Sequence, residues 1–395
     1  MYPLDEKLGL IGIRNTESRY TQRFAHILTE LAAEMPMDRT ADMLCQICEL
    51  KLGTASIPDI LDSIGAIYLP ETSTDSSAAI SEQELPQQQN NFIGKKIEEI
   101  EANPDKDEII KAAVEKSNHP VKDIKGSNTA EKTVFYVGCD GTGVPGIRKE
   151  LEGKKGKQSD GSAKTFEAKI GVCFKQDFDG NGNPLLKNGE IYRREGDNKY
   201  TGTVENVNEF GPMLNNFSGK NGIGQSDQIV FIGDGATWIW RLQKTHFPNA
   251  IAIVDKYHAI ENLNEIVDKL RFNKAEIREE FRDKCQGLLS LGKIEELDEV
   301  IMNKTTKSNE ATIGKRFEYF RKNKERMRYG LFVAAGLFIG SGVVEAACKT
   351  VVCNRLKRAG AHWSKKGAAN IIAIRCAILS KEFDKHLSRS NTCAA

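Results

Sequence analysis

The chain has 395 residues, a formal net charge of +1, and contents of 39% hydrophobic and 28% charged residues. This length leaves room for about two or three domains, and the composition is that of a soluble globular protein. No stretch reaches the roughly 18 uncharged apolar residues of a membrane span, so we expect no membrane partner. The N-terminus has no basic flank followed by an apolar core, which predicts no signal peptide. The nine irregularly spaced cysteines then suit reduced thiols in a cytoplasmic protein.

The first part of the chain, over 1–70, is predicted to be a small all-helical module. Apolar side chains recur there at helical spacing, and a Gly-containing turn separates two of the predicted helices. Two short helices joined in this way fit a helix-turn-helix that reads DNA, and they fit an ordinary helical hairpin about as well. The segment 71–130 is first Ser- and Gln-rich and then charged, which predicts a polar linker with exposed charged helices.

Strand patterns begin near residue 131. Runs of β-branched and aromatic residues predict three strands, at 133–139, 166–174 and 190–195, separated by Gly- and Asn-rich turns. A predicted helix at 203–217 follows. Strand and helix then alternate at 228–233, 236–247, 250–254 and 255–270. This order predicts an α/β fold of the ribonuclease-H-like type over 131–272.

Two further regions complete the predicted organisation. Residues 273–335 are charged and helical in pattern, which indicates a helical insertion. Residues 336–390 hold a predicted helix at 343–357 and a basic C-terminal region. From Glu345 to Arg389, ten Lys or Arg residues stand against three Asp or Glu residues. Local basic clusters of this kind suit contacts with phosphate.

Three acidic residues occupy comparable places in this arrangement. Asp140 follows the first predicted strand, Asp234 follows the fourth, and Glu345 lies on the last predicted helix. In a ribonuclease-H-like sheet the first and fourth strands are neighbours, so Asp140 and Asp234 are expected to meet. Clustered carboxylates repel one another unless hard cations neutralise them, which predicts that the three acids bind Mg²⁺, with Mn²⁺ as a substitute. Such a site can catalyse phosphoryl transfer on DNA.

Each of these carboxylates also has a purely structural interpretation. Asp234 could cap the helix that follows it, and Asp140 could belong to an Asp-Gly turn. Glu345 could be an ordinary residue of a helix surface. Asp255, at the end of the next strand, is a rival third carboxylate, with His258 three residues later. We interpret Asp255 as a helix cap, and His258 as a residue that supports the site or faces DNA.

Several segments, in order, resemble DDE transposases of bacterial insertion sequences of the ISKra type. The similarity runs from about 134 to 380 and includes CDGTGVP, FIGDGATWIW, IVDKYHAIENL and GSGVVEAACKTVVCNRLK. It implies a cytoplasmic enzyme that binds the terminal inverted repeats of an element, cuts the element out and joins its 3′ ends to target DNA. It also implies that the DDE triad falls on Asp140, Asp234 and Glu345. We expect several copies of the chain to assemble on the DNA.

Basic residues near the triad are predicted to contact the DNA backbone. They lie in the loop after Asp140 and beside the last helix: Arg148, Lys149, Lys154, Lys155, Lys157, Lys349, Arg355, Lys357 and Arg358. Trp363 stands among cations, where an aromatic ring could stack on an unpaired base. Packing in the core explains this tryptophan equally well.

Two other functions fit the same residues. A ribonuclease-H-like nuclease, such as a resolvase or repair enzyme, would use the triad without strand transfer. A DNA-binding protein derived from a transposase would need no catalysis, although the presence of all three acids favours an enzyme.

Overall fold

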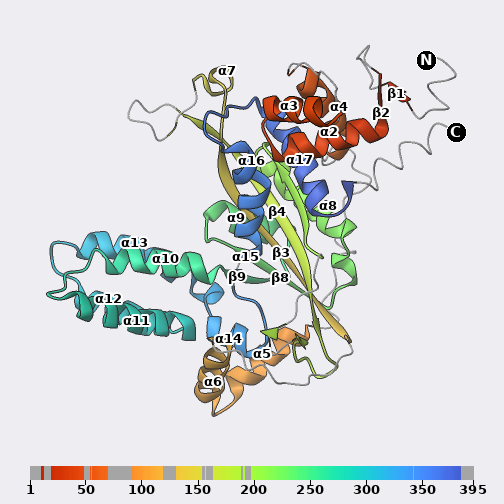
Figure 1. The fold of residues 1–395 in the computed structure, drawn as a ribbon. Helices are drawn as coiled ribbons and strands as arrows, with labels where there is room; N and C mark the ends of the chain where they lie inside the picture. The colour runs from red at the N-terminus through yellow and green to blue at the C-terminus, as the bar shows by residue number, and fades with distance from the viewer. Residues whose placement is uncertain are drawn as a thin grey trace.

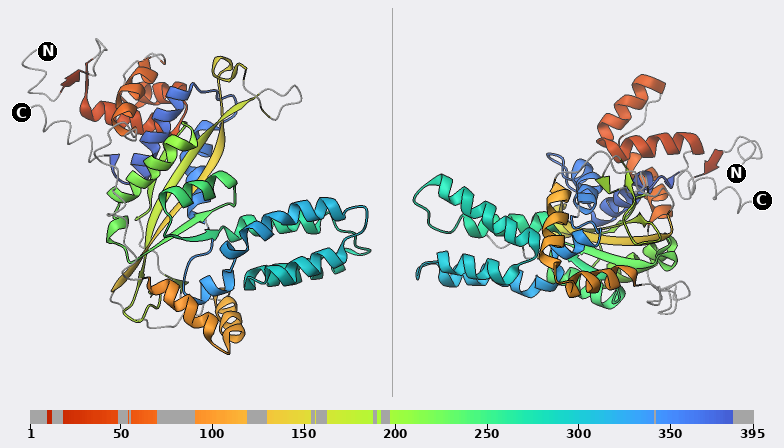
Figure 2. Two further views of the ribbon diagram at one scale, coloured as in Figure 1. Left: turned by 180° about the vertical axis from the view of Figure 1, so that it is seen from behind. Right: turned by 90° about the horizontal axis from the view of Figure 1, so that it is seen from below.

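A computed structural model describes residues 10–12, 19–48, 54, 56–69, 91–118, 130–153, 156, 163–187, 190–191, 197–340 and 342–383. A five-stranded mixed sheet lies at its centre, with helices on its faces and a helical arm that projects to one side (Figures 1 and 2). Within these residues, every helix is too short or too polar to span a membrane.

The central sheet has the strand order β7-β4-β3-β8-β9. Its members are β3 (Lys132–Pro145), β4 (Thr165–Phe178), β7 (Lys199–Thr203), β8 (Gln228–Gly233) and β9 (Ile251–Val254). The pairs β3–β4 and β4–β7 are antiparallel, whereas β3–β8 and β8–β9 are parallel. Strand β8 is buried along its whole length, as the apolar run predicts for a central parallel strand. The expected pairing of the first and fourth strands is therefore confirmed.

Two strand predictions need correction. Strand β3 does not end before Asp140 but continues to Pro145, because β4 pairs with it along the whole length and overrides the local Asp-Gly turn signal. The third strand of the sheet is β7 and not 190–195. The described part of that stretch contributes only β6 (Glu190–Ile191), which pairs with β5 (Leu186–Lys187). Gly202 in β7 has no side chain, which leaves room for Ile170 and Ile372 against its backbone.

Helices follow the strands much as the pattern predicts. They are α8 (Val207–Lys220), α9 (Thr237–His246) and α10 (Lys256–Val267), with a 3-10 turn η1 (Ile223–Gln225) before β8. The arm combines α10 with α11 (Ala275–Leu291), α12 (Ile294–Lys304) and α13 (Glu310–Asn323) (Figure 1). Then come η2 (Lys324–Arg326) and α14 (Tyr329–Ala334). Buried residues of the arm, among them Leu289, Leu297 and Phe317, belong to the same hydrophobic core as β3 and β8.

The N-terminal helices pack at one end of the sheet and a second helical pair packs at the other (Figure 1). The first group is α2 (Gln22–Glu34), α3 (Met37–Cys48) and α4 (Ser56–Tyr68), preceded by β1 (Leu10–Gly12) and β2 (Arg19–Thr21). It shares a core with α17 (Lys365–Leu379). The second pair is α5 (Phe92–Ala102) and α6 (Lys106–Asn118), which lies against α14. Both groups were predicted to be helical, but the second was predicted to be exposed, whereas Ile93 and Ile97 of α5 are buried in the same core as β3.

The predicted helix at 343–357 is divided into three parts. It begins as α15 (Gly342–Ala347), continues as a π-helical turn η3 (Cys348–Cys353) and ends as α16 (Asn354–Leu356). Helix α15 crosses β3 closely, because Gly138 leaves the space that the side chain of Val344 fills. Single π-helical turns inside a helix often mark functional sites, since they re-aim the side chains that follow.

Candidate active site

Strand register places Asp140 and Asp234 side by side. The parallel pairing of β3 and β8 ends at Gly138 opposite Ile232, and each aspartate lies two residues beyond its member of that pair. The charge of Asp234 acts on Asp140, so the two carboxylates lie near each other. They lie at the carboxyl end of β8, where open α/β sheets commonly bind ligands.

Asp140 is a half-buried carboxylate with a neighbour of the same charge. Burial raises its pKa, and the charge of Asp234 adds to that effect. Hydrogen bonds from the Cys348 thiol and the Gly141 amide act in the opposite direction, as does the charge of His258; the Gly141 N to Asp140 Oδ1 distance is 2.6 Å. Burial also raises the pKa of Cys348, so its thiol stays protonated and donates to Asp140. These groups compensate the charge only in part, since the pKa of Asp140 stays raised, and this favours a cation at this position.

Asp234 is held by its own turn and is not the cap of the helix that follows. Its Oδ1 accepts a hydrogen bond from the amide of Ala236 at 2.8 Å, while the cap position of α9 is Ala236 itself, which makes no side-chain cap bond. Gly235 has φ of +99°, a conformation that glycine adopts without steric cost. The local backbone therefore turns sharply at Asp234 and leaves the helix without a carboxylate cap.

Asp255 has the role of a cap, as predicted. Its side chain accepts a hydrogen bond from the amide of His258 at 2.9 Å at the start of α10, and it is 1% exposed. The His258 ring lies near enough to Asp140 for the charge of the ring to lower the pKa of Asp140. The distance between His258 Nδ1 and Glu261 Oε2 is 3.2 Å. His258 thus borders the pair of aspartates, consistent with a supporting position.

Glu345 is exposed on α15. Three residues later on the same helical segment, Cys348 bonds to Asp140, and residues three apart share a helix face. However, across the residues that the structure describes, no three His, Cys, Asp or Glu side chains form a group that could hold a metal ion. The structure therefore brings Asp140 and Asp234 together but does not gather Glu345 into a three-carboxylate cluster.

The chemistry of the aspartate pair fits a hard divalent cation. Both side chains offer carboxylate oxygens, which Mg²⁺ and Mn²⁺ prefer. The raised pKa of Asp140 shows that the neighbouring groups do not offset the cost of its buried charge. A bound cation would remove that cost, so the observed pair fits the predicted magnesium site in part.

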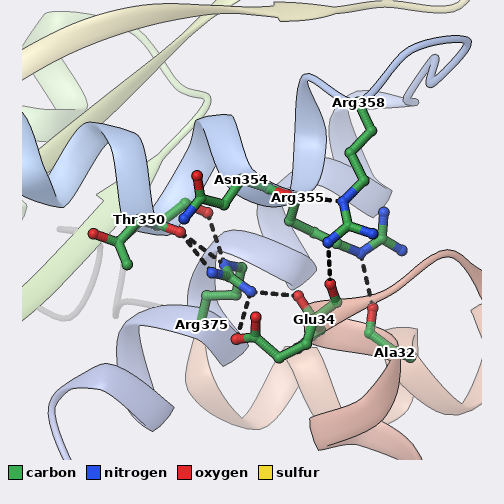
Figure 3. A network of polar contacts seen from close by, with 9 residues as sticks. Ala32, Glu34, Thr350, Asn354, Arg355, Arg358 and Arg375 are labelled. Atoms are coloured by element: carbon green, nitrogen blue, oxygen red, sulfur yellow. Dashed lines mark hydrogen bonds and ion pairs between the residues drawn. The ribbon is translucent and has the colours of Figure 1, made fainter.

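Three arginines from the C-terminal part of the chain bind the end of an N-terminal helix (Figure 3). Two of them, Arg355 and Arg358, were predicted to contact DNA. The last carbonyls of a helix have no partner within it, and cations suit this negative end. Here Arg355 Nε donates to Ala32 O at 2.9 Å, Arg375 Nη1 to Ala33 O at 2.5 Å and Arg358 Nη2 to Glu34 O at 2.6 Å. Consecutive carbonyls of α2 are thereby capped by residues from the C-terminal part of the chain.

The prediction that Arg355 contacts DNA is wrong. Its side chain is 3% exposed, and burial lowers its pKa to about 10. Arg358 is exposed, but two hydrogen bonds, to Asn354 O and Glu34 O, fix its guanidinium at the end of α2. The sequence predicts both as surface cations, because Ala32 O and Glu34 O lie more than 300 residues away and no local pattern reveals these partners.

Trp363 belongs to the core and does not present its ring for base stacking. It is 9% exposed, its Nε1 donates to Leu356 O at 3.1 Å, and the Arg355 guanidinium lies 4.8 Å from its ring centroid. A buried tryptophan usually pairs its N–H in this way. Of the two interpretations of this residue, core packing is the one that the structure confirms.

The other predicted DNA contacts remain exposed or fall outside the description. Arg148 and Lys149 are exposed on α7 (Arg148–Leu151), and Lys349 and Lys357 are exposed beside α15 and α16. Lys357 Nζ donates to Thr142 Oγ1 at 2.5 Å, two residues along β3 from Asp140. Lys154, Lys155 and Lys157 lie outside the described residues. Four of the predicted cations are thus exposed, and one of them, Lys357, is bonded close to Asp140 along β3.

Sequence reasoning missed three residues that shape the site. Cys348 bonds to Asp140, Arg375 joins α17 to α2 and η3, and Tyr319 Oη donates to Asp234 O at 2.9 Å. Cys348 lies within GVVEAACKTVVC, next to Glu345, and that proximity was a usable signal. Tyr319 and Arg375 had none, because each lies in an ordinary helical pattern far from its partner.

Comparison with known proteins gives a family but no activity. Residues 155–384, more than half of the chain, match the model of a family described as Uncharacterised protein family (UPF0236). No curated protein matches the chain. The match includes Asp234, Glu345, the arm and α17, and it begins after Asp140. The chain therefore belongs to the family UPF0236.

Proposed function

We propose that this protein is a DDE transposase with a ribonuclease-H-like core, which cleaves DNA at element ends and joins them to target DNA. Support for the fold comes from three antiparallel strands followed by alternating helices and strands, with the first and fourth strands adjacent. Support for the family within transposases comes from the resemblance of the quoted segments to ISKra-type enzymes. Cytoplasmic location and assembly of several copies on DNA are parts of the same proposal.

The observation that carries the proposal is the paired placement of Asp140 and Asp234. Asp140 on β3 and Asp234 just after the neighbouring parallel strand β8 lie close together, and burial raises the pKa of Asp140. The π-helical turn η3, which continues the helix that bears Glu345, is joined to Asp140 by the hydrogen bond of Cys348. Acidic side chains brought together at such cost are typical of functional sites, because folding alone does not favour them.

In this function the aspartates and Glu345 would hold Mg²⁺, which supplies Lewis acidity and an activated oxygen nucleophile for phosphoryl transfer. Asp140 and Asp234 supply fixed oxygens. Cys348 and the amides of Gly141 and Ala236 orient those oxygens through hydrogen bonds. The exposed cations nearby would hold the phosphate backbone in register with the aspartates.

Cleavage of DNA by the purified protein is expected to depend on Mg²⁺ or Mn²⁺. The substrate is a labelled duplex that carries the terminal inverted repeats flanking the gene, incubated with supercoiled target DNA, and products are separated on denaturing gels. Ca²⁺ should permit binding with little cleavage, because its looser coordination positions the reacting groups less well.

The products of this experiment distinguish the candidate functions. Joined strands support a transposase, cleavage without joining points to a nuclease, and binding without either points to a DNA-binding protein. Full cleavage in excess chelator would refute the proposed magnesium site. Asp140→Asn, assayed in parallel, must be inactive, because this shows that the cleavage comes from the protein and not from a contaminant.

Binding to DNA is expected to weaken with salt through the exposed cations near the site. Each phosphate contact on duplex DNA contributes roughly 0.9 to the slope of log K against log salt. Replacing Lys149, Lys349 and Lys357 together with Ala should therefore flatten the slope by about two to three units. The loss should be equal on specific and random duplexes, since contacts to the backbone carry no sequence information.

A matched control replaces three exposed lysines of the arm, Lys274, Lys307 and Lys315, with Ala. This variant has the same change in net charge, and its slope should stay that of the parent protein. Equal slopes for both triple variants would remove the DNA-contacting role from the surface beside Asp140. Melting curves of both triple variants and of the parent protein show whether a change in DNA binding comes from a loss of folding.

A further inference from the structure

One side chain of α13, in the helical arm, reaches the turn that carries Asp234. Tyr319 lies on α13, and its hydroxyl donates to the backbone carbonyl of Asp234 at 2.9 Å, across 85 residues of sequence. The bond reaches the residue whose charge acts on Asp140. The arm is thus not only attached to the sheet through the core but also bonded to the backbone of a proposed ligand.

The ring of Tyr319 also closes the turn after Asp234. Gly235 has φ of +99°, and a Cβ at this position would collide with the Tyr319 ring. The ring therefore packs directly on the glycine backbone. The hydroxyl thus holds Asp234 and the ring holds Gly235. These two contacts fix the backbone from which the Asp234 side chain projects.

Tyr319 is itself fixed by α10, the helix that begins beside the aspartates. The side chain of Asn262 hydrogen-bonds both the Tyr319 hydroxyl and His258 O, the latter at 2.9 Å. One turn before Tyr319 on the same helix, Arg316 forms a 2.6 Å ion pair with Glu265. Burial raises the pKa of Tyr319, and the charges of Asp234 and Asp255 add to this effect, so the hydroxyl remains protonated and able to donate.

We propose that Tyr319 is a positioning residue for Asp234, through which the helical arm sets the geometry of the active site. The inference rests on the proposed function for its catalytic consequence, but the contact to the turn stands independently. Side chains and backbone groups that orient ligands in this way typically affect metal affinity or activity by about 10- to 100-fold. A shift of the arm when DNA binds would be transmitted to Asp234 by the same bond.

The test compares Tyr319→Phe, which removes the hydroxyl and keeps the ring, with Tyr329→Phe. Tyr329 is a buried tyrosine of α14 whose hydroxyl has no hydrogen-bond partner among the described residues. Hydrogen exchange of the peptide that contains Asp234 and Gly235 should become about fivefold faster in Tyr319→Phe and remain unchanged in Tyr329→Phe. DNA cleavage by Tyr319→Phe should fall about tenfold, with unchanged affinity for DNA.

The two measurements separate the inference from the function on which it rests. Unchanged exchange in Tyr319→Phe would overturn the positioning role, whatever the activity. Faster exchange with an unaltered cleavage rate would overturn it as well. If the parent protein does not cleave DNA while exchange still accelerates, the proposed function fails and the contact from the arm to the Asp234 turn is supported.

Discussion

Replacing Asp140 with Asn is expected to abolish DNA cleavage and, at the same time, to raise the melting temperature of the metal-free protein. The expected loss of rate is about a thousandfold or more, equivalent to about 4 kcal/mol in the activation barrier. DNA binding should persist, because the change removes no phosphate contact. Cleavage assays, binding titrations and melting curves of the same preparation measure the three effects.

The gain in stability follows from the sign of the pKa shift. Burial raises the pKa of Asp140 in the folded state, so the folded protein binds a proton more readily than the unfolded chain. The resulting penalty is absent below the ordinary aspartate pKa of about 3.9 and grows as the pH rises towards the raised value. Asparagine carries no charge and removes the penalty at neutral pH. Mg²⁺ should in turn raise the melting temperature of the parent protein but not that of Asp140→Asn.

Other carboxylate variants serve as comparisons. Asp234→Asn and Glu345→Gln should also lose cleavage, whereas Asp255→Asn should retain activity, because asparagine caps a helix about as well as aspartate does. An inactive Asp255→Asn beside an active Glu345→Gln would show that the third ligand is misassigned. A melting temperature of Asp140→Asn below that of the parent protein would contradict the electrostatic account of Asp140.

Replacing Arg375 with Leu is expected to destabilise the protein by about 3–5 kcal/mol. The Arg375 side chain is 2% exposed and donates to Thr350 O, Val351 O and Ala33 O, besides its 2.7 Å ion pair with Glu34 (Figure 3). Leucine fills similar space but leaves these carbonyls without a donor. Urea unfolding measures the loss, and limited proteolysis should show the N-terminal helices released first.

A matched control is Arg316→Leu, which removes an exposed ion pair with Glu265 at a similar distance of 2.6 Å. Exposed pairs are worth at most about 1 kcal/mol, so this variant should unfold close to the parent protein. Arg375→Lys should remain destabilised, because a lysine offers one ammonium where the guanidinium bonds several carbonyls. Equal stability of Arg375→Leu and Arg316→Leu would refute the bonding role of Arg375.

The parts of the fold that could be predicted are the elements whose structure depends on the residues of their own segment. Strand β8 is a continuous apolar run closed by a glycine and an aspartate, and its predicted limits agree with the structure. The meeting of Asp140 and Asp234 was predicted from the strand order expected of a ribonuclease-H-like sheet, in which the first and fourth strands are neighbours, and these two strands do pair. The N-terminal helices were visible in the spacing of apolar residues, and the arm was visible in a charged, helical pattern without strand signals.

The remainder depends on partners that are distant in sequence. Asp140 was expected at a strand end, but β4 extends the pairing of β3 to Pro145. Arg355 looked like a surface cation, yet its partner is Ala32 O at the end of a helix. In both cases the sequence showed which charged group was present. Its surroundings were set by a segment from another part of the chain.

The capping of α2 by C-terminal arginines has a consequence for the order of events during synthesis. Ala33 and Arg375 are 342 residues apart, so the first helix emerges long before the residue that completes it. At translation rates of about 5–20 residues per second, the delay is roughly 20 to 70 s. Until then the end of α2 has only water as a partner, and η3, which follows Glu345, lacks its own anchor. A chain that ends before Arg375 would therefore lack the bonds that join α2 and η3 to α17.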